Sequence, residues 1–154
     1  MKSIFLVIAV LSSLGLNAQR KMPAISFLEN SLEFADANKS FSEVGQLTDT
    51  LRDDQIVKAL TKILAENENL QIELAGHCAG NEDTLISQQR ADLVKQMLID
   101  GGISSSRIDS KGYGFKEPVI TNQILLSLSS RAERDEANLR NRRVEIKVVG
   151  VKPE

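Results

Sequence analysis

Among the side chains of this protein, Arg90 has the position that says most about the possible chemistry. It falls among apolar residues on one side of a predicted helix over residues 84–100. A guanidinium in that position has five N–H donors to satisfy, so it needs a carboxylate, several carbonyl groups or a bound ligand. Periodicity alone leaves two interpretations open. One is an internal ion pair or a snorkelling side chain, and the other is an anion-binding site at the early end of the helix.

His77 and Cys78 are the other reactive side chains in a notable position, adjacent at the end of a predicted strand. Neighbours on a strand point to opposite faces, so the pair needs ligands from elsewhere to form a metal site. No obvious nucleophile is spaced with His77 as in a catalytic triad, and no pair of carboxylates suggests acid–base hydrolysis. We therefore predict a protein that is not an enzyme and uses no metal or cofactor.

The first 18 residues predict a signal peptide. Lys2 gives a short basic start, residues 4–11 form an unbroken apolar run, and Ala18 offers a small residue for cleavage. The run is too short to cross a bilayer as a stable helix, and no later segment reaches a membrane length. We expect an exported, soluble protein without a membrane span, with residues 19–30 as a lead-in segment and residues 31–150 as one domain.

Composition limits the partners and the means of stabilisation. The net charge of −2 argues against a field that attracts nucleic acid or anionic lipid. The single cysteine, Cys78, cannot form an internal disulfide and lies too far from the amino terminus to carry a lipid anchor. It is either a buried small residue or a free thiol. With 42% hydrophobic and 4% aromatic residues, the core is expected to be aliphatic.

Apolar spacing predicts alternating helices and strands. One helix is expected over residues 53–66, and the helix that carries Arg90 should end at Gly101-Gly102. Residues 120–140 should contain a loop and a further helix. Four strands are expected where apolar and polar residues alternate, at residues 32–34, 70–74, 108–114 and 144–148. The predicted fold is an α+β two-layer sandwich, a four-stranded mixed sheet with helices on one face.

Three sequence blocks stand in order with helix-length gaps between them. They are Gly76-His77-Cys78 with the following Ile86-Ser87-Gln88-Gln89-Arg90-Ala91, then Lys111-Gly112-Tyr113-Gly114, and finally Asn141-Arg142-Arg143-Val144-Glu145-Ile146. In combination these blocks resemble the OmpA-like carboxy-terminal domain, with which many envelope proteins of Gram-negative bacteria hold peptidoglycan. The resemblance covers residues 31–149 and implies the OmpA-like fold.

The resemblance implies a role for Arg90. In the family, the arginine of the stretch matched by Ile86-Ser87-Gln88-Gln89-Arg90-Ala91 grips a carboxylate of diaminopimelate in the peptidoglycan stem peptide through two parallel hydrogen bonds. An aspartate directly after the residues matched by Gly76-His77-Cys78 takes the ammonium group of the ligand, but Ala79 stands at that position here. Either Glu82 or Asp83 takes over this role, or the ammonium contact is lost.

The resemblance adds four further candidate residues. Asn38 resembles a polar residue that helps to line the family's pocket, although it suits a turn equally well. His77 belongs to the first block, where a packed or hydrogen-bonded role is favoured. Arg142 and Arg143 belong to the third block. Since neighbours on a strand face opposite ways, one of these arginines is expected to point toward the pocket and the other toward solvent.

The resemblance implies a function in the cell envelope. We expect non-covalent binding of diaminopimelate-containing peptidoglycan by an exported domain in the periplasm, associated with the outer membrane. Outer-membrane or other envelope proteins are further candidate partners. The alternative is a degenerate OmpA-like domain that serves as a protein-interaction or assembly module and has lost wall binding together with the aspartate.

Overall fold

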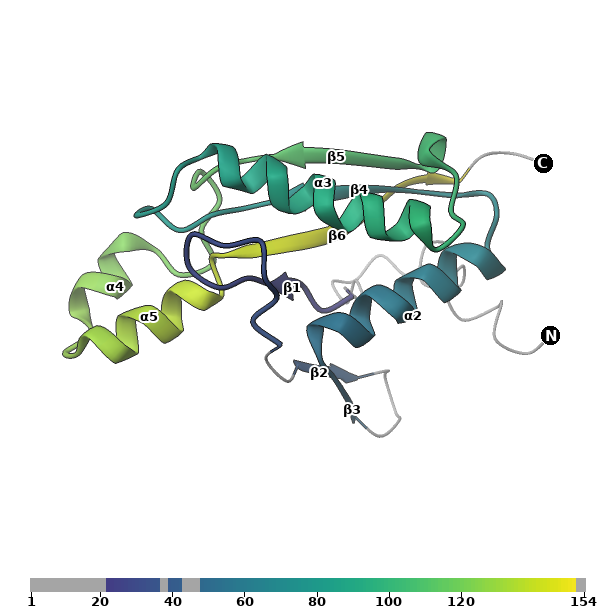
Figure 1. The fold of residues 1–154 in the computed structure, drawn as a ribbon. Helices are drawn as coiled ribbons and strands as arrows, with labels where there is room; N and C mark the ends of the chain where they lie inside the picture. Colours follow the sequence, from purple (N-terminus) through teal and green to yellow (C-terminus); the bar gives the residue numbers. More distant parts are fainter. Residues whose placement is uncertain (1–21, 37–38, 43–47, 152–154) are drawn as a thin grey trace, which may run out of the picture.

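The computed structural model describes residues 22–36, 39–42 and 48–151, so the predicted signal peptide and Asn38 lie outside the described residues. The main sheet has four strands in the order β1-β6-β4-β5 (Figure 1). Strands β4 and β5 are parallel, and β6 runs antiparallel to both β4 and β1. The strands are β1 (Ile25–Ser26), β4 (Leu70–Gly76), β5 (Ile108–Gly112) and β6 (Arg143–Val151). This is the predicted four-stranded mixed sheet.

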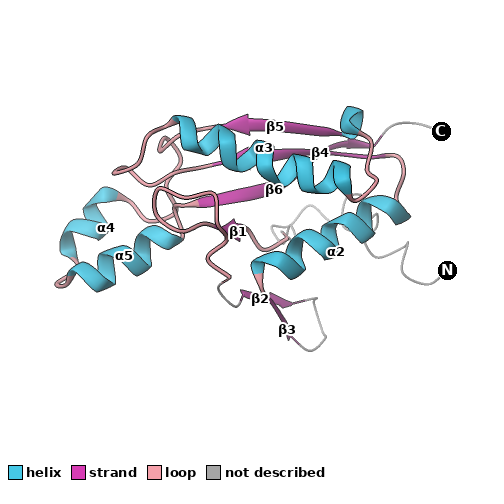
Figure 2. Ribbon diagram, viewed as in Figure 1, coloured by secondary structure: helices cyan, strands magenta, loops and turns pink. Residues whose placement is uncertain are grey.

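Four helices occur among the described residues, and the two longest cover one face of the sheet (Figures 1 and 2). They are α2 (Asp53–Glu66), α3 (Leu85–Asp100), α4 (Asn122–Ser127) and α5 (Arg131–Leu139). A 3-10 turn, η1 (Ser105–Arg107), leads into β5, and a separate hairpin is formed by β2 (Lys39–Ser42) and β3 (Thr48–Leu51). Helices α4 and α5 form a pair beyond the start of β6 (Figure 2).

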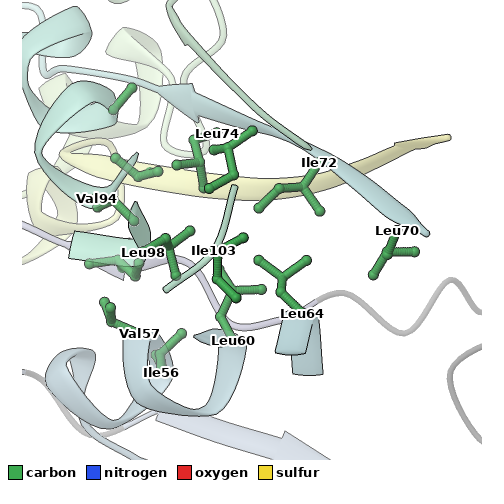
Figure 3. Packing of buried hydrophobic residues seen from close by; sticks show 14 of the residues in the cluster. Ile56, Val57, Leu60, Leu64, Leu70, Ile72, Leu74, Val94, Leu98 and Ile103 are labelled. Carbon is green, nitrogen blue, oxygen red and sulfur yellow. The ribbon is translucent and has the colours of Figure 1, made fainter. Parts of the chain in front are cut away.

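The core lies between α2, α3 and the sheet and is almost entirely aliphatic (Figure 3). Helix α2 buries Ile56, Leu60 and Leu64 at helical spacing, and β4 buries Ile72 and Leu74 at strand spacing. Helix α3 ends where predicted, since Gly102 adopts a φ of 95°, the left-handed conformation that suits glycine. The periodic segments of the sequence therefore form the predicted elements.

The first strand differs from the prediction. Leu32 is exposed and Phe34 makes only an isolated bridge to Phe27, whereas Ile25 and Phe27 are fully buried. The strand lies at Ile25–Ser26 and pairs with the start of β6, so the packed domain begins before residue 31. The alternation at residues 32–34 was misleading because burial depends on a pairing partner more than 100 residues away in the chain.

Candidate functional site: a closed arginine–carboxylate site

The three sequence blocks converge at one end of the sheet, where β4 and β5 end and α3 begins. Two glycines permit this close packing. A Cβ on Gly76 would lie 2.8 Å from the carbonyl carbon of Ser87 and closer still to its oxygen, and one on Gly112 would lie 2.7 Å from the amide nitrogen of Gln88. The Ser87 hydroxyl accepts a hydrogen bond from the N–H of Gly114 at 3.0 Å. The first turn of α3 is thereby held directly on the strand ends.

Arg90 lies on the buried face of α3, as its place among apolar residues predicts, and its side chain forms an ion pair with Glu82. Nη2 donates to Oε1 of Glu82 at 2.6 Å and Nη1 donates to Oε2 at 2.9 Å, which is a bidentate arrangement. Both side chains are fully buried. In this structure Arg90 is therefore an internal ion-pair residue, one of the two interpretations that the sequence left open.

Backbone carbonyl groups accept the remaining hydrogen bonds of Arg90. Nε donates to the carbonyl of Ser31 at 3.2 Å, Nη2 to that of Leu28 at 3.0 Å and Nη1 to that of His77 at 3.3 Å. The guanidinium also lies 5.3 Å from the ring centroid of Phe27. Five hydrogen bonds match the five N–H donors of the guanidinium, so none is left for a ligand unless a partner moves.

Both carboxylate oxygens of Glu82 also accept hydrogen bonds from backbone N–H groups. Its Oε2 accepts the N–H of Ala79 and its Oε1 accepts the N–H of Asn30, each at 2.8 Å. Burial by itself raises the pKa of this carboxyl, but the hydrogen bonds from Arg90, Ala79 and Asn30 outweigh it and hold the pKa below its usual value. We call the Arg90 guanidinium and these two backbone N–H groups the carboxylate site. Glu82 occupies it as an ionised group.

Asp83 lies beside this site and, unlike Glu82, is exposed to solvent. Its side chain is exposed, and Oδ1 accepts the N–H of Leu85 at 2.9 Å at the start of α3. Ala79, which stands at the position of the family aspartate, is fully buried and contributes only its N–H. Of the two acids that could replace that aspartate, Glu82 is committed to Arg90 and Asp83 faces solvent.

Sequence reasoning missed the backbone groups of this site. The carbonyl groups of Leu28 and Ser31 and the N–H of Asn30 come from one loop after β1, which the sequence placed at the edge of a lead-in segment. Loop backbone carries no residue-type signal for such a role. The positive φ of 48° at Asn30 is consistent with asparagine's tolerance of left-handed conformations, and the asparagine could have indicated a turn there.

His77 lies on the opposite face of the sheet from the carboxylate site. Gly76 and Gly112 face α3, so His77 and Tyr113 face away from it. The His77 ring stacks on Tyr113 with 5.5 Å between the ring centroids, is 1% exposed and makes no hydrogen bond through either ring nitrogen within the described structure. Burial, followed by the charge of Arg143, lowers the pKa of His77 to about 4. The imidazole is therefore neutral at physiological pH.

A neutral buried His77 predicts acid sensitivity. Its pKa rises from about 4 when folded to 6.5 when unfolded, so the unfolded chain binds more protons between these values. We expect its contribution to stability to be present above pH 6.5 and to decline by about 3 kcal/mol as the pH falls to 4. His77→Phe keeps a stacked ring without a titrating group. Between pH 7 and pH 4 the urea midpoint of wild type should fall relative to that of His77→Phe; a constant difference would refute the assignment.

Arg142 and Arg143 are both buried, so the expectation that one of them points to solvent is wrong. Arg142 donates to the carbonyl groups of Phe27 and Asp135. Arg143 forms an ion pair with Glu145 at 2.6 Å and donates to the Glu117 carbonyl at 3.0 Å. Glu117 lies in the loop before α4, so this hydrogen bond joins that loop to the start of β6. Both arginines tie β6 to neighbouring segments.

The described residues contain no cluster of three or more His, Cys, Asp or Glu side chains placed to hold a metal ion. Cys78 is a buried free cysteine, and burial raises the pKa of its thiol. A hollow is lined in part by Arg143, Glu145 and Ile146 of the third block, and its lining does not include Arg90.

Comparison with known proteins identifies the family. The model of the OmpA family matches residues 44–144, about two thirds of the chain. The chain belongs to the OmpA family. Over 72 residues this OmpA-family chain is 40% identical to outer membrane porin F of Pseudomonas fluorescens, a match that covers 43% of the chain and 22% of the porin. The chain thus spans about a fifth of the length of that relative.

Solved structures of OmpA-like domains share the fold. The C-terminal domain of Helicobacter pylori MotB matches with a TM-score of 0.58 and 18% identity, covering 83% of this chain and 86% of that one. The peptidoglycan-associated lipoprotein of Burkholderia pseudomallei matches with a TM-score of 0.54 and 15% identity, covering 81% and 88%. None of the helices among the described residues combines the length and apolar character needed to span a bilayer.

Proposed function

We propose that this OmpA-family chain binds peptidoglycan non-covalently in the cell envelope, through a carboxylate of the stem peptide. The observation that carries the proposal is the carboxylate site itself. Two guanidinium nitrogens of Arg90 and the N–H groups of Ala79 and Asn30 all donate to one carboxylate, at 2.6–2.9 Å. Four convergent donors of this kind stabilise a bound carboxylate group far more than a neutral ligand.

Diaminopimelate carries a carboxylate and an ammonium group, and residues in and beside the carboxylate site could bind both. Its carboxylate would take the place of the Glu82 carboxylate against Arg90. Its ammonium group would pair with Asp83, whose carboxylate is exposed beside the site and uses one oxygen for the N–H of Leu85. The proposal therefore assigns the ammonium contact, which Ala79 cannot make, to Asp83 in preference to Glu82.

Membership of the OmpA family supports an envelope role, and one structural neighbour is named a peptidoglycan-associated lipoprotein. The proposed location is the periplasm, reached by the predicted signal peptide, with outer-membrane or other envelope proteins as additional partners. The proposed role is recognition and not catalysis.

One observation favours the alternative function. Arg90 and Glu82 are both fully buried, and the five N–H donors of Arg90 all find acceptors within the protein, as in a purely structural pair. A domain closed in this way could act as a protein-interaction or assembly module without contacting peptidoglycan. Binding to sacculi separates the two functions directly.

We expect the protein to co-sediment with diaminopimelate-type sacculi at low ionic strength and to be released by free diaminopimelate. Arg90→Lys keeps the charge but loses the two parallel hydrogen bonds, so its affinity should fall by about 1.5–3 kcal/mol. The folded fraction of each variant is checked by circular dichroism before sedimentation. Wild-type protein that stays in the supernatant would favour the interaction module.

Asp83→Asn tests the ammonium contact, because asparagine can still accept the N–H of Leu85 but carries no charge. Weaker binding without a change in the unfolding midpoint would assign the ammonium group to Asp83. Glu29→Gln is a matched control, since Glu29 is an exposed acid bonded to Asn81 in the same region. Equal losses in both variants would indicate a general effect of charge.

A further inference from the structure

Glu82 binds the carboxylate site as a ligand would. The guanidinium comes from helix α3 and the N–H of Asn30 from the loop after β1, whereas the carboxylate comes from the connection between β4 and α3, which also supplies the N–H of Ala79. Both oxygens of Glu82 are used, each by one guanidinium nitrogen and one backbone N–H. The site is complete without Glu82 and holds it through the carboxylate group.

The segment that carries Glu82 is exposed beside it, where Nδ2 of Asn81 donates a hydrogen bond to the exposed Glu29 at 2.7 Å. Gly80 and Asn81 are exposed, and no atom lies within 4 Å of a Cβ placed on Gly80. The backbone of Glu82 donates one hydrogen bond, to the carbonyl of Ala79 at 3.1 Å within a tight turn. This connection projects from the end of the sheet (Figure 1). Glu82 could therefore leave the site by movement of a short loop, without disturbing the packing of α3 or β4.

We propose that Glu82 is a tethered internal ligand of the carboxylate site, and that an external carboxylate binds by exchange with it. The inference rests on the proposed function and adds its regulation. A desolvated guanidinium cannot remain without an anion, so the site is filled by one carboxylate or the other. A tethered carboxylate has an effective concentration in the millimolar range or above, so it lowers the apparent affinity of an external ligand by competition.

The first test empties the site without using peptidoglycan. Glu82→Ala leaves the Arg90 guanidinium buried without its anion and should lower the melting temperature. Sodium acetate should then raise the melting temperature of Glu82→Ala by about 4 °C or more relative to sodium chloride at equal ionic strength. Wild-type protein should respond to the two salts alike, because Glu82 already fills the site. Acetamide, which is neutral and of similar shape, should have no effect.

Two matched variants define the response. Glu82→Gln fills the same space with a neutral amide and should show no specific response to acetate. Asp83→Ala removes the neighbouring exposed acid and should also show none. If Glu82→Ala is unfolded in chloride, acetate should refold it. Glu82→Asp is the milder variant; its side chain is one methylene shorter, and acetate should stabilise it by a smaller amount.

The outcomes distinguish this inference from the proposed function. A response to acetate no greater than that to chloride in both Glu82→Ala and Glu82→Asp overturns the internal-ligand assignment, whether or not wild-type protein binds sacculi. Acetate rescue without sacculus binding would support the assignment and refute the proposed function. If both hold, Glu82→Ala should bind free diaminopimelate about tenfold or more tightly than wild type, because the tethered competitor is gone. Equal affinities would contradict the exchange mechanism.

Discussion

Replacing Arg90 by alanine is expected to lower the free energy of unfolding by about 3–5 kcal/mol. The substitution removes the bidentate partner of Glu82 and leaves a fully buried carboxylate with only two backbone donors. It also leaves the carbonyl groups of Leu28 and Ser31 without their hydrogen bonds from the guanidinium. An uncompensated buried charge is among the few causes of losses this large.

Urea unfolding of the two proteins measures this effect, and Arg131→Ala serves as the control. Arg131 pairs with Asp135 at 3.6 Å, but its side chain is 88% exposed, so its loss should leave the midpoint unchanged. The double variant Arg90→Ala with Glu82→Ala should lose much less than the sum of the single variants, since neither charge is then left alone. A loss below about 1 kcal/mol for Arg90→Ala would mean that water solvates the guanidinium in solution and that the site stands open.

Replacing Gly76 by alanine is expected to be comparably damaging, by about 3 kcal/mol or more, for a steric reason. The added Cβ would overlap the carbonyl group of Ser87 and lie 3.2 Å from the Cβ of Ala91, so α3 must move away from β4. Backbone atoms in a packed helix cannot yield as a flexible side chain can. Movement of α3 would also displace Arg90 from Glu82, so we expect weaker wall binding in the fraction that folds.

Gly80→Ala is the matched control, four residues further along the same connection. A Cβ on Gly80 meets no atom within 4 Å, so the variant should unfold within about 0.5 kcal/mol of wild type. Thermal and urea unfolding of the two alanine variants can be compared under one set of conditions. Equal midpoints for Gly76→Ala and wild type would show that α3 does not rest on the end of β4.

Much of the fold could be predicted from the sequence because its signals are local. The spacing of Ile56, Leu60 and Leu64 marks a helix that buries one side, and the alternation of Ile72 and Leu74 with polar residues marks a strand that buries one face. The position of β1 could not be predicted in this way. Ile25 and Ser26 form a strand only because residues 143 and 144 lie beside them, and such a partner leaves no periodic pattern in a segment of two residues.

The candidate site, like the fold, could be predicted from the sequence only in part. The sequence by itself determined that Arg90 lies on the apolar side of α3 and must find acceptors, because helical periodicity and the donor count of a guanidinium are properties of the residues. Only the tertiary structure decided which acceptors it finds. The choice between Glu82 and Asp83, and the arrival of the loop after β1 with two carbonyl groups and one N–H, depend on backbone paths that bring distant segments within 3.3 Å of one guanidinium and its partner. Hydrogen bonds are short-ranged and directional, so residue types alone could not determine whether the site is open or already filled.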